Sequence, residues 1–445
     1  MAIMANQKTY RRYLVLWVGQ KTSLLGSSIV QFAIIWYITL ITQNALYLAL
    51  ASLLGFGTQV ILSPLAGVYA DRWNRKLIIG ITDLFQALAT IVLIGLFFFQ
   101  AQQLWHIFAL LTVRGVLQAF QAPTFGAIIP TMVPKEKLGF MNSINFLFVG
   151  IIFLLGPVIS AILLTLWPIG QILWVDTITF GIAIVPLLLI NIPSVRNQDA
   201  KQIRSSFIKE FSEGLTVIKK TRGFTATLLT AMAINFLLVP LNTLMPYYIN
   251  VNHFGVELDL AFVMALQQFG VIVGSLFMAL KKDFSRKVLV MVISVYGLFF
   301  GYIMAALAPT GAIWTIALGL LIIGTIIPIL NITILTIVQV SIPLEMQGRI
   351  NSVIIALSNA ISPLGMIYAG VFAEAIGVVP LFLISAFIGI LTTTVSWLFT
   401  DMRHVLDMEN IDESKKGKTI ENLTEDSPTM IQMNLESSEA ESTIA

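Results

Sequence analysis

Long apolar runs separated by short polar segments dominate the chain. A membrane-spanning helix needs about 20 mostly apolar residues, and twelve segments satisfy this requirement. The first six predicted spans cover residues 13–41, 46–69, 77–99, 104–130, 140–166 and 171–192. The second six cover residues 224–250, 258–280, 287–308, 311–340, 350–373 and 377–400. We therefore predict an all-α membrane protein with twelve transmembrane helices in two homologous six-helix bundles.

Two polar segments interrupt this pattern and divide the chain. We predict an N-terminal six-helix bundle at residues 1–192, a cytoplasmic linker at 193–222, a C-terminal six-helix bundle at 223–400 and a disordered acidic tail at 401–445. Within the linker, one face of a helical period carries Phe207, Phe211, Leu215 and Ile218. This pattern predicts an amphipathic helix along the inner membrane surface, with a plain solvated connector as the alternative.

Composition agrees with a lipid-facing protein. Of 445 residues, 57% are hydrophobic and 11% charged, and the mean hydropathy is +0.88, whereas soluble domains carry about 25% charged residues. The absence of cysteine excludes disulfides and thiolate metal sites. The three histidines, at positions 106, 253 and 404, have no metal-binding spacing. We therefore predict no metal and no cofactor.

Basic residues lie in alternate loops. Lysine and arginine occur before the first span, between spans 2 and 3, 4 and 5, 8 and 9, and 10 and 11, in the linker and in the tail, while the opposite loops carry none. The positive-inside rule then places both termini and the linker in the cytoplasm. Inside the spans only Lys21 and Arg114 are basic. The basic N-terminus has no small-residue cleavage site after it, so the first span is not a removable signal peptide.

An internal repeat links the two halves. Residues 134–143, PKEKLGFMNS, match residues 343–352, PLEMQGRINS, with proline, glutamate, glycine, asparagine and serine in register. The two segments join spans 4 and 5 and spans 10 and 11, which are equivalent positions in two six-helix halves. Chance similarity of polar loops is the alternative. Two parallel halves are a known transporter plan.

A glycine, an aspartate and three basic residues cluster between spans 2 and 3. The motif consists of Gly67, Asp71, Arg72, Arg75 and Lys76. Such a loop can hold one conformation by binding acidic or helix-terminal partners across the cytoplasmic seam, and the alternative is a simple positive-inside anchor. Asp83, two turns into span 3, is predicted to form a structural ion pair near this loop and joins the predicted conformational latch.

This loop, in a six-plus-six chain, resembles the signature of the major facilitator superfamily over about residues 10–400, although Asn74 stands where that family usually has glycine. Further segments resemble the macrolide-efflux branch, namely Trp17-Val-Gly19-Gln20, Ala51–Phe56, Asp83-Leu84 and the Asp176 region. The branch resemblance implies proton-coupled drug export.

Span 4 carries the clearest candidate for coupling. Arg114, Gln118 and Gln121 lie on one helical face, and a charge near mid-membrane costs about 2.5–3.5 kcal/mol. Arginine followed four residues later by glutamine resembles the second motif of drug exporters, where it is linked to proton coupling. Arginine does not deprotonate, so we expect Arg114 to act on a carboxylate or an anionic group, or else to anchor neighbouring carbonyls. Asp176 in span 6 is the candidate protonatable carboxylate.

Weaker candidates line other spans. Gly156-Pro157 resembles the exporters' antiporter motif and predicts a kink with close packing, with an ordinary packing kink as the alternative. Lys21 either functions in the cavity or reaches the headgroups. By the resemblance, spans 1, 4, 7 and 10 line the cavity, and their polar residues are Gln20, Ser23, Ser27, Gln31, Asn235, Asn242 and Asn331. Isolated polar groups on an apolar wall suit an amphiphilic substrate, and helix–helix hydrogen bonding is the alternative.

These patterns predict a secondary transporter and no enzyme. The predicted partners are a small-molecule substrate, protons and the lipid bilayer of the plasma membrane, without nucleic acid, and the predicted state is a monomer. Import or export of another small solute on the same fold is one alternative. A non-transporting membrane receptor is another, and it would require a folded soluble domain.

Overall fold

A computed structural model describes residues 7–70, 73–192, 212, 215–219, 221, 223–281, 284, 286–342 and 344–404, and these residues form helices and short connections without a strand. The first half contains α1 (Gln7–Thr42), α2 (Ala45–Ser52), the π-helix η1 (Leu53–Gly57), α3 (Thr58–Ala70), α4 (Arg75–Phe98), α5 (Leu104–Met132), the 3-10 helix η2 (Lys135–Lys137), α6 (Leu138–Leu166) and α7 (Ile169–Leu189). The second half contains α9 (Phe224–Tyr247), the π-helix η3 (Tyr248–Asn252), α10 (Glu257–Leu280), α11 (Lys287–Ala306), α12 (Ile313–Ser341), α13 (Leu344–Ala360), α14 (Ser362–Ile376), α15 (Val378–Phe399) and the 3-10 helix η4 (Asp401–His404).

The helices correspond to the predicted spans. In the described part of the chain, eleven helical segments are long and apolar enough to cross a membrane. The predicted second span is α2, η1 and α3 in succession, and the eleventh is α13 followed by α14. The remaining expected span, α5, has 29 residues but is not among the eleven, because its polar side chains lower its hydropathy. An all-α membrane fold is confirmed, and the count of twelve stays a prediction.

Several predicted features fall partly outside the described residues. The linker face includes Phe207 and Phe211, which are not described, whereas residues 215–219 are helical. Ile218 is 1% exposed and belongs to the hydrophobic cluster of the second half. Ile218 therefore packs against protein, and the amphipathic helix along the inner membrane surface stays a prediction. Of the sequence repeat, Pro343 is outside the described residues, as is the tail after residue 404.

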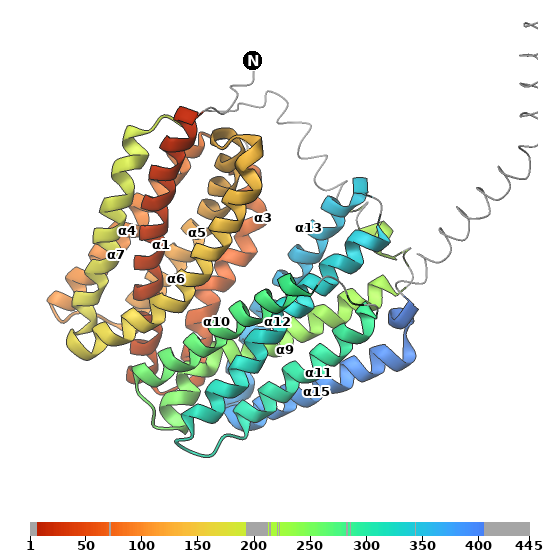
Figure 1. The fold of residues 1–445 in the computed structure, drawn as a ribbon. Coiled ribbons are helices and arrows are strands. Elements are labelled where there is room, and N and C mark those ends of the chain that lie inside the picture. Colours follow the sequence, from red (N-terminus) through yellow and green to blue (C-terminus); the bar gives the residue numbers. More distant parts are fainter. Residues whose placement is uncertain are drawn as a thin grey trace, which may run out of the picture.

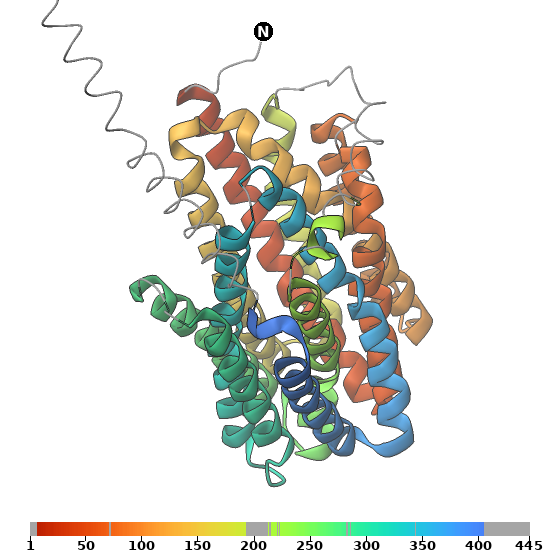
Figure 2. The same ribbon diagram turned by 90° about the vertical axis from the view of Figure 1, so that its right-hand side faces the viewer.

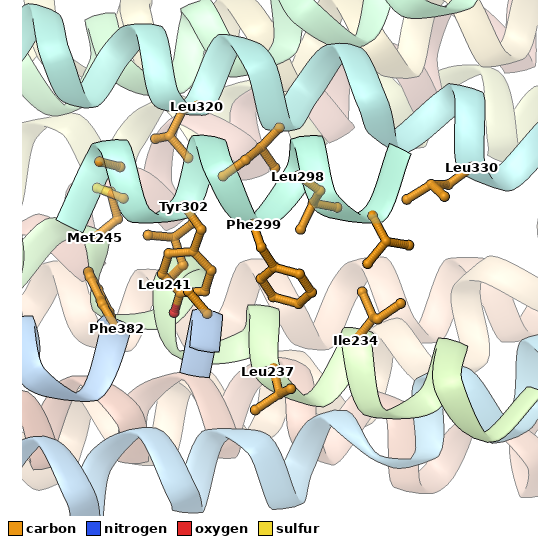
Figure 3. Close-up of a cluster of buried hydrophobic side chains, with 14 of the residues drawn as sticks. Ile234, Leu237, Leu241, Met245, Leu298, Phe299, Tyr302, Leu320, Leu330 and Phe382 are labelled. Atoms are coloured by element: carbon orange, nitrogen blue, oxygen red, sulfur yellow. The ribbon is translucent and has the colours of Figure 1, made fainter. Parts of the chain in front are cut away.

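Each half packs around its own interior. In the first half α1 contacts α6 and α7, and α4 contacts α5 and α7; in the second, α12 contacts α10 and α11, and α15 contacts α9 and α11. Figure 3 shows apolar side chains of α9, α11, α12 and α15 meeting in the second half. Glycines permit the closest approaches, because a Cβ on Gly274 or Gly324 would lie 2.0 Å from a backbone oxygen of the facing helix. Small residues at such crossings are typical of membrane helices.

The two halves meet at one end of the molecule. They diverge toward the end where α1 begins (Figure 1), and Figure 2 gives the perpendicular view. Contacts between the halves join α6 to α10 and α2 to α14 and α9. Phe32, Trp36, Ala45, Ala49 and Ala161 of the first half are buried in the same cluster as the core of the second half. We call these five residues the apolar seam.

Candidate functional site

A cavity of about 1230 Å³ lies between the two halves. Its walls are formed by helices of both halves, with α1, α4, α5 and α7 on one side and α9, α10, α11 and α12 prominent on the other. The structure brings all ten predicted coupling and cavity residues to these walls, namely Gln20, Lys21, Gln31, Arg114, Gln118, Gln121, Asp176, Asn235, Asn242 and Asn331. This volume exceeds the roughly 300–1,000 Å³ that is typical of small-molecule sites.

Arg114 and Asp176 form a buried ion pair in the cavity wall. The Nη1 atom of Arg114 donates to Oδ2 of Asp176 at 2.6 Å, and the two side chains are 2% and 6% exposed. The Ser27 hydroxyl donates to Oδ1 of the same carboxylate at 2.7 Å, and the Thr90 hydroxyl lies 3.0 Å from Oδ2. The pair therefore connects α5 to α7 with support from α1 and α4. The sequence singled out both charged residues without showing that they meet.

The guanidinium of Arg114 has further donors. Its Nε and Nη2 atoms are buried and donate to no atom of the part of the chain that the structure describes. Directly beside it, Gly115 packs against η1, where an added Cβ would lie 2.3 Å from the Gly55 carbonyl oxygen. π-Helical turns often occur at functional sites. This close crossing fixes the depth of Arg114 relative to the second span.

Asp83 lies among glutamines. Gln20 Nε2 donates to Oδ2 of Asp83 at 2.9 Å, and Gln121 Nε2 donates to Oδ1 at 2.5 Å. Asp83 borders the cavity and is 2% exposed. Within residues 7–70 and 73–192 no lysine or arginine forms an ion pair with it. The predicted ion pair of Asp83 with the loop is therefore absent for Arg75 and Lys76, and for Arg72, which is outside the described residues, it stays a prediction.

The bases of the loop bind backbone oxygens instead. Arg75 Nη1 donates to the Ala127 carbonyl at 2.9 Å, and Lys76 Nζ donates to the Leu188 carbonyl at 2.8 Å. Asp83 lies eight residues further along α4, which is about 12 Å along the helix axis. That depth separates it from the helix end, where Arg75 and Lys76 act. Asp71 and Arg72 are outside the described residues.

Within the described residues, Gly67 makes no close contact, since a Cβ at this position would meet nothing within 4 Å. The C-terminal end of α3, which carries Gly67, lies at the end where the two halves diverge (Figure 1). Asn74 takes the place of the family's usual glycine with φ −66° and ψ 112°, so no left-handed conformation is required. Its side chain instead caps α4 by accepting from the backbone N–H groups of Lys76 and Leu77.

Polar groups of α4 lie between the two carboxylates. Gln121 bonds to Asp83, and its Oε1 atom accepts from Gln86 Nε2 at 3.3 Å. The Thr90 hydroxyl lies 3.0 Å from the Gln86 carbonyl oxygen and 3.0 Å from the Asp176 carboxylate. Gln86 and Thr90 were not predicted from the sequence. The missed signal is their spacing on α4, where Asp83, Gln86 and Thr90 lie at i, i+3 and i+7 on one face.

The wall of the second half has a different chemistry. Asn235 and Asn242 are exposed to the cavity, and each amide also donates to a carbonyl one turn earlier, of Ala231 and Leu238. Gln267 and Gln268 also line this wall and were missed, as were five methionines: Met245, Met264, Met291, Met366 and Met402. All four charged residues of the lining, Lys21, Asp83, Arg114 and Asp176, belong to the first half.

Gly156 and Pro157 position α6 against α1. A Cβ on Gly156 would lie 2.2 Å from Ser28 Oγ, and the Ser160 hydroxyl donates to the Ile29 carbonyl at 2.7 Å. The predicted close packing is therefore present. Pro157 lies inside α6 and borders the cavity. Lys21 is half-buried in the cavity wall, with Nζ 5.9 Å from the centre of the Trp17 ring.

A family model matches this architecture. Residues 16–365 match the Major Facilitator Superfamily. The chain belongs to this superfamily. The transporter is 28% identical over 397 residues to Macrolide efflux protein A of Streptococcus pyogenes, covering 88% of this chain and 96% of that protein. It is 24% identical over 394 residues to the Multidrug efflux pump Tap of Mycolicibacterium fortuitum, covering 85% and 93%.

Solved structures share the facilitator fold. A bacterial homologue of the iron transporter ferroportin in an inward-facing state superposes with a TM-score of 0.66 at 15% identity, covering 87% of this chain and 98% of that one. At this identity the likeness concerns the fold alone. Together with the apolar helices, the match establishes a multi-pass membrane transporter of the facilitator fold.

Proposed function

We propose that this facilitator exports amphiphilic or lipophilic compounds, including macrolide-like drugs, in exchange for protons by alternating access. The observation that carries the proposal is the buried Arg114–Asp176 ion pair in the wall of a cavity between two halves. Charges at this depth in a membrane protein usually face a transport pathway. The direction of transport is supported by relatives whose names include macrolide and multidrug efflux.

In this proposal residues 1–192 and 223–400 move as two bodies around the cavity. The apolar seam closes one end, and the halves diverge at the end where α1 begins. With both termini in the cytoplasm, as the basic loops favour, this conformation is open to the inside. A compound then enters from the cytoplasm or inner leaflet. The loop from Gly67 to Lys76 closes that end in the opposite conformation, where the free surface of Gly67 accepts a helix of the second half.

Proton coupling is assigned to the carboxylates of the first half. Arg114 stays charged throughout, because a guanidinium does not release its proton under these conditions. It holds Asp176 when that carboxylate is ionised, and protonation of Asp176 loosens the pair. The exit of a compound is thereby tied to the state of this pair. Inward movement of one charge supplies about 2.3 kcal/mol per 100 mV of membrane potential.

The test is drug accumulation in a bacterial strain that lacks its own exporters. We expect cells that express the chain to accumulate less macrolide or lipophilic dye than empty-vector cells, and a protonophore to remove the difference. Arg114→Ala should abolish the pH-dependent part. Asn235→Ala changes an uncharged cavity residue and serves as the control, which should retain coupling. Equal accumulation in expressing and empty-vector cells would exclude export of these compounds.

A further inference from the structure

The charges in the cavity wall do not balance locally. Of its two carboxylates, Asp176 is neutralised by Arg114 at 2.6 Å. Among the described residues, Asp83 receives two neutral amide donors, from Gln20 and Gln121. The other lining cation, Lys21, has its Nζ 5.9 Å from the Trp17 ring centre and forms no ion pair within the described residues. Asp83 is therefore the carboxylate of the cavity that lacks a fixed countercharge.

A carboxylate in this position requires a mobile positive partner. An ionised acid inside the membrane is costly unless it is paired, and two amides supply only part of the compensation. The protein nonetheless aims two donors at Asp83 from α1 and α5, an arrangement that favours the ionised form when a cation arrives. The cavity beside it has ample room for a drug-sized cation at about 1230 Å³.

We infer that Asp83 is a recognition site for the protonated amine of a cationic amphiphilic substrate. The amine reaches Asp83 by displacing Gln121, whose side chain is only half-buried. Carbonyl oxygens of the Gln20 and Gln121 amides are then available as further acceptors. The apolar body of the substrate lies against the opposite wall, where methionines offer an adaptable surface. This inference deepens the proposed export function by naming the substrate chemistry.

The neighbouring residues explain why Asp83 and not Asp176 performs this role. Asp176 already has three partners, which occupy both carboxylate oxygens. Displacing Arg114 from it would leave a buried guanidinium without its counterion. At Asp83 an incoming cation displaces a neutral amide only. Among the described residues, the second half contributes no competing charge to the lining.

The experiment uses a matched pair of fluorescent probes on the purified, full-length protein in detergent. One probe is dansylcadaverine, whose primary amine is protonated at neutral pH, and the other is its N-acetylated, uncharged form. Dansyl fluorescence reports binding to an apolar cavity. We expect the wild type to bind the amine about tenfold or more tightly than the acetylated probe, as a charge-assisted bond implies. We expect Asp83→Asn to lose that preference while it binds the acetylated probe as the wild type does.

Glu374→Gln is the matched control, because Glu374 is an exposed carboxylate of α14 outside the cavity lining. It should keep the wild-type preference. A preference that persists in Asp83→Asn would overturn the assignment. The assignment would also be overturned if the affinity for both probes changed equally with pH, because Asp83 would then bind a proton and not the substrate amine.

A second measurement needs no variant and decides the question if Asp83→Asn does not fold. Dicyclohexylcarbodiimide modifies carboxyl groups in apolar surroundings, and peptide mass spectrometry locates the adducts. We expect dansylcadaverine to protect Asp83 and the acetylated probe not to do so, whereas equal protection would contradict the inference. Both measurements report binding and not transport, so they test the inference separately from the proposed export. If the protein did not export drugs, the preference for the amine probe could still be observed. If that preference were missing, drug efflux could still be observed.

Discussion

Removing one member of the Arg114–Asp176 pair should destabilise the protein more than removing both. The two side chains are nearly inaccessible, at 2% and 6% exposure, and their charged atoms are 2.6 Å apart. Breaking such a pair from one side leaves an uncompensated buried charge and costs about 3–5 kcal/mol. Replacing both members by apolar side chains removes that charge. Ser27 and Thr90 then lose one acceptor group, at a cost of about 1 kcal/mol each.

The perturbation is a double-mutant cycle with Arg114→Met and Asp176→Leu. Thermal unfolding in detergent, followed by tryptophan fluorescence, gives the midpoint for each variant. We expect both single variants to unfold well below the wild type and the double variant to unfold above either single one. As a control, Arg114→Met combined with Asn74→Ala should show additive effects, because the two sites are far apart and share no partner. Additive losses in the cycle itself would refute the idea that the pair is energetically coupled.

Three further predictions concern packing, capping and protonation. Gly389→Ala places a Cβ 2.0 Å from the Phe299 ring and should lower the free energy of unfolding by about 1–3 kcal/mol. Gly181→Ala is the control, because its Cβ meets nothing within 4 Å. Equal thermal midpoints for the two variants would contradict the close packing of Gly389 against Phe299. Asn74→Ala should lower the free energy of unfolding by about 1 kcal/mol and Asn74→Gly by only a few tenths. If thermal unfolding showed a larger loss for Asn74→Gly than for Asn74→Ala, the capping role of Asn74 would be disproved. Burial lowers the pKa of His253, which follows the span ending at Asn252. The neutral imidazole is thus favoured on folding, so its contribution should be present above about pH 6.5 and lost as the pH falls below that value. His253→Gln should reduce the loss of thermal midpoint as the pH falls below about 6.5. An unchanged slope would contradict a role of His253 in this pH dependence.

The sequence predicted the helices because membrane spans are encoded locally. Apolar runs of about 20 residues fix where a span lies, and helical periodicity placed Arg114, Gln118 and Gln121 on one face. Asn235 and Asn242 were expected at the cavity from the resemblance to the facilitator superfamily and not from periodicity. It could not show that η1 interrupts the second span as a π-helix, because hydropathy is insensitive to a single wider turn. The position of Gly115 against η1 depends on that turn.

Contacts between side chains of different helices were harder to predict than which side chains share one face of a helix. Asp83 was expected near the basic loop because the two are close in sequence, but its neighbours come from α1 and α5, 63 and 38 residues away. Which helices pack together is decided by the whole bundle. Gly67 shows a different limit, since a sequence motif does not reveal that the space beside this glycine is open in the described part of the chain.

The placement of the polar network constrains how any coupling can work. Asp83, Gln86, Thr90, Arg114 and Asp176 lie on α4, α5 and α7, with support from α1, and all of these helices belong to the first half. Rocking of one half against the other as rigid bodies would therefore leave these hydrogen bonds intact. What such a movement changes is the wall that faces them, which carries amides and methionines but no charge. Coupling then has to act through a change within the first half, by protonation of Asp176 or by a cation beside Asp83, rather than through the rocking movement alone. For this reason a neutral substitution at Asp83 should alter which compounds are carried, whereas one at Arg114 should alter whether the protein is stable and responsive to pH.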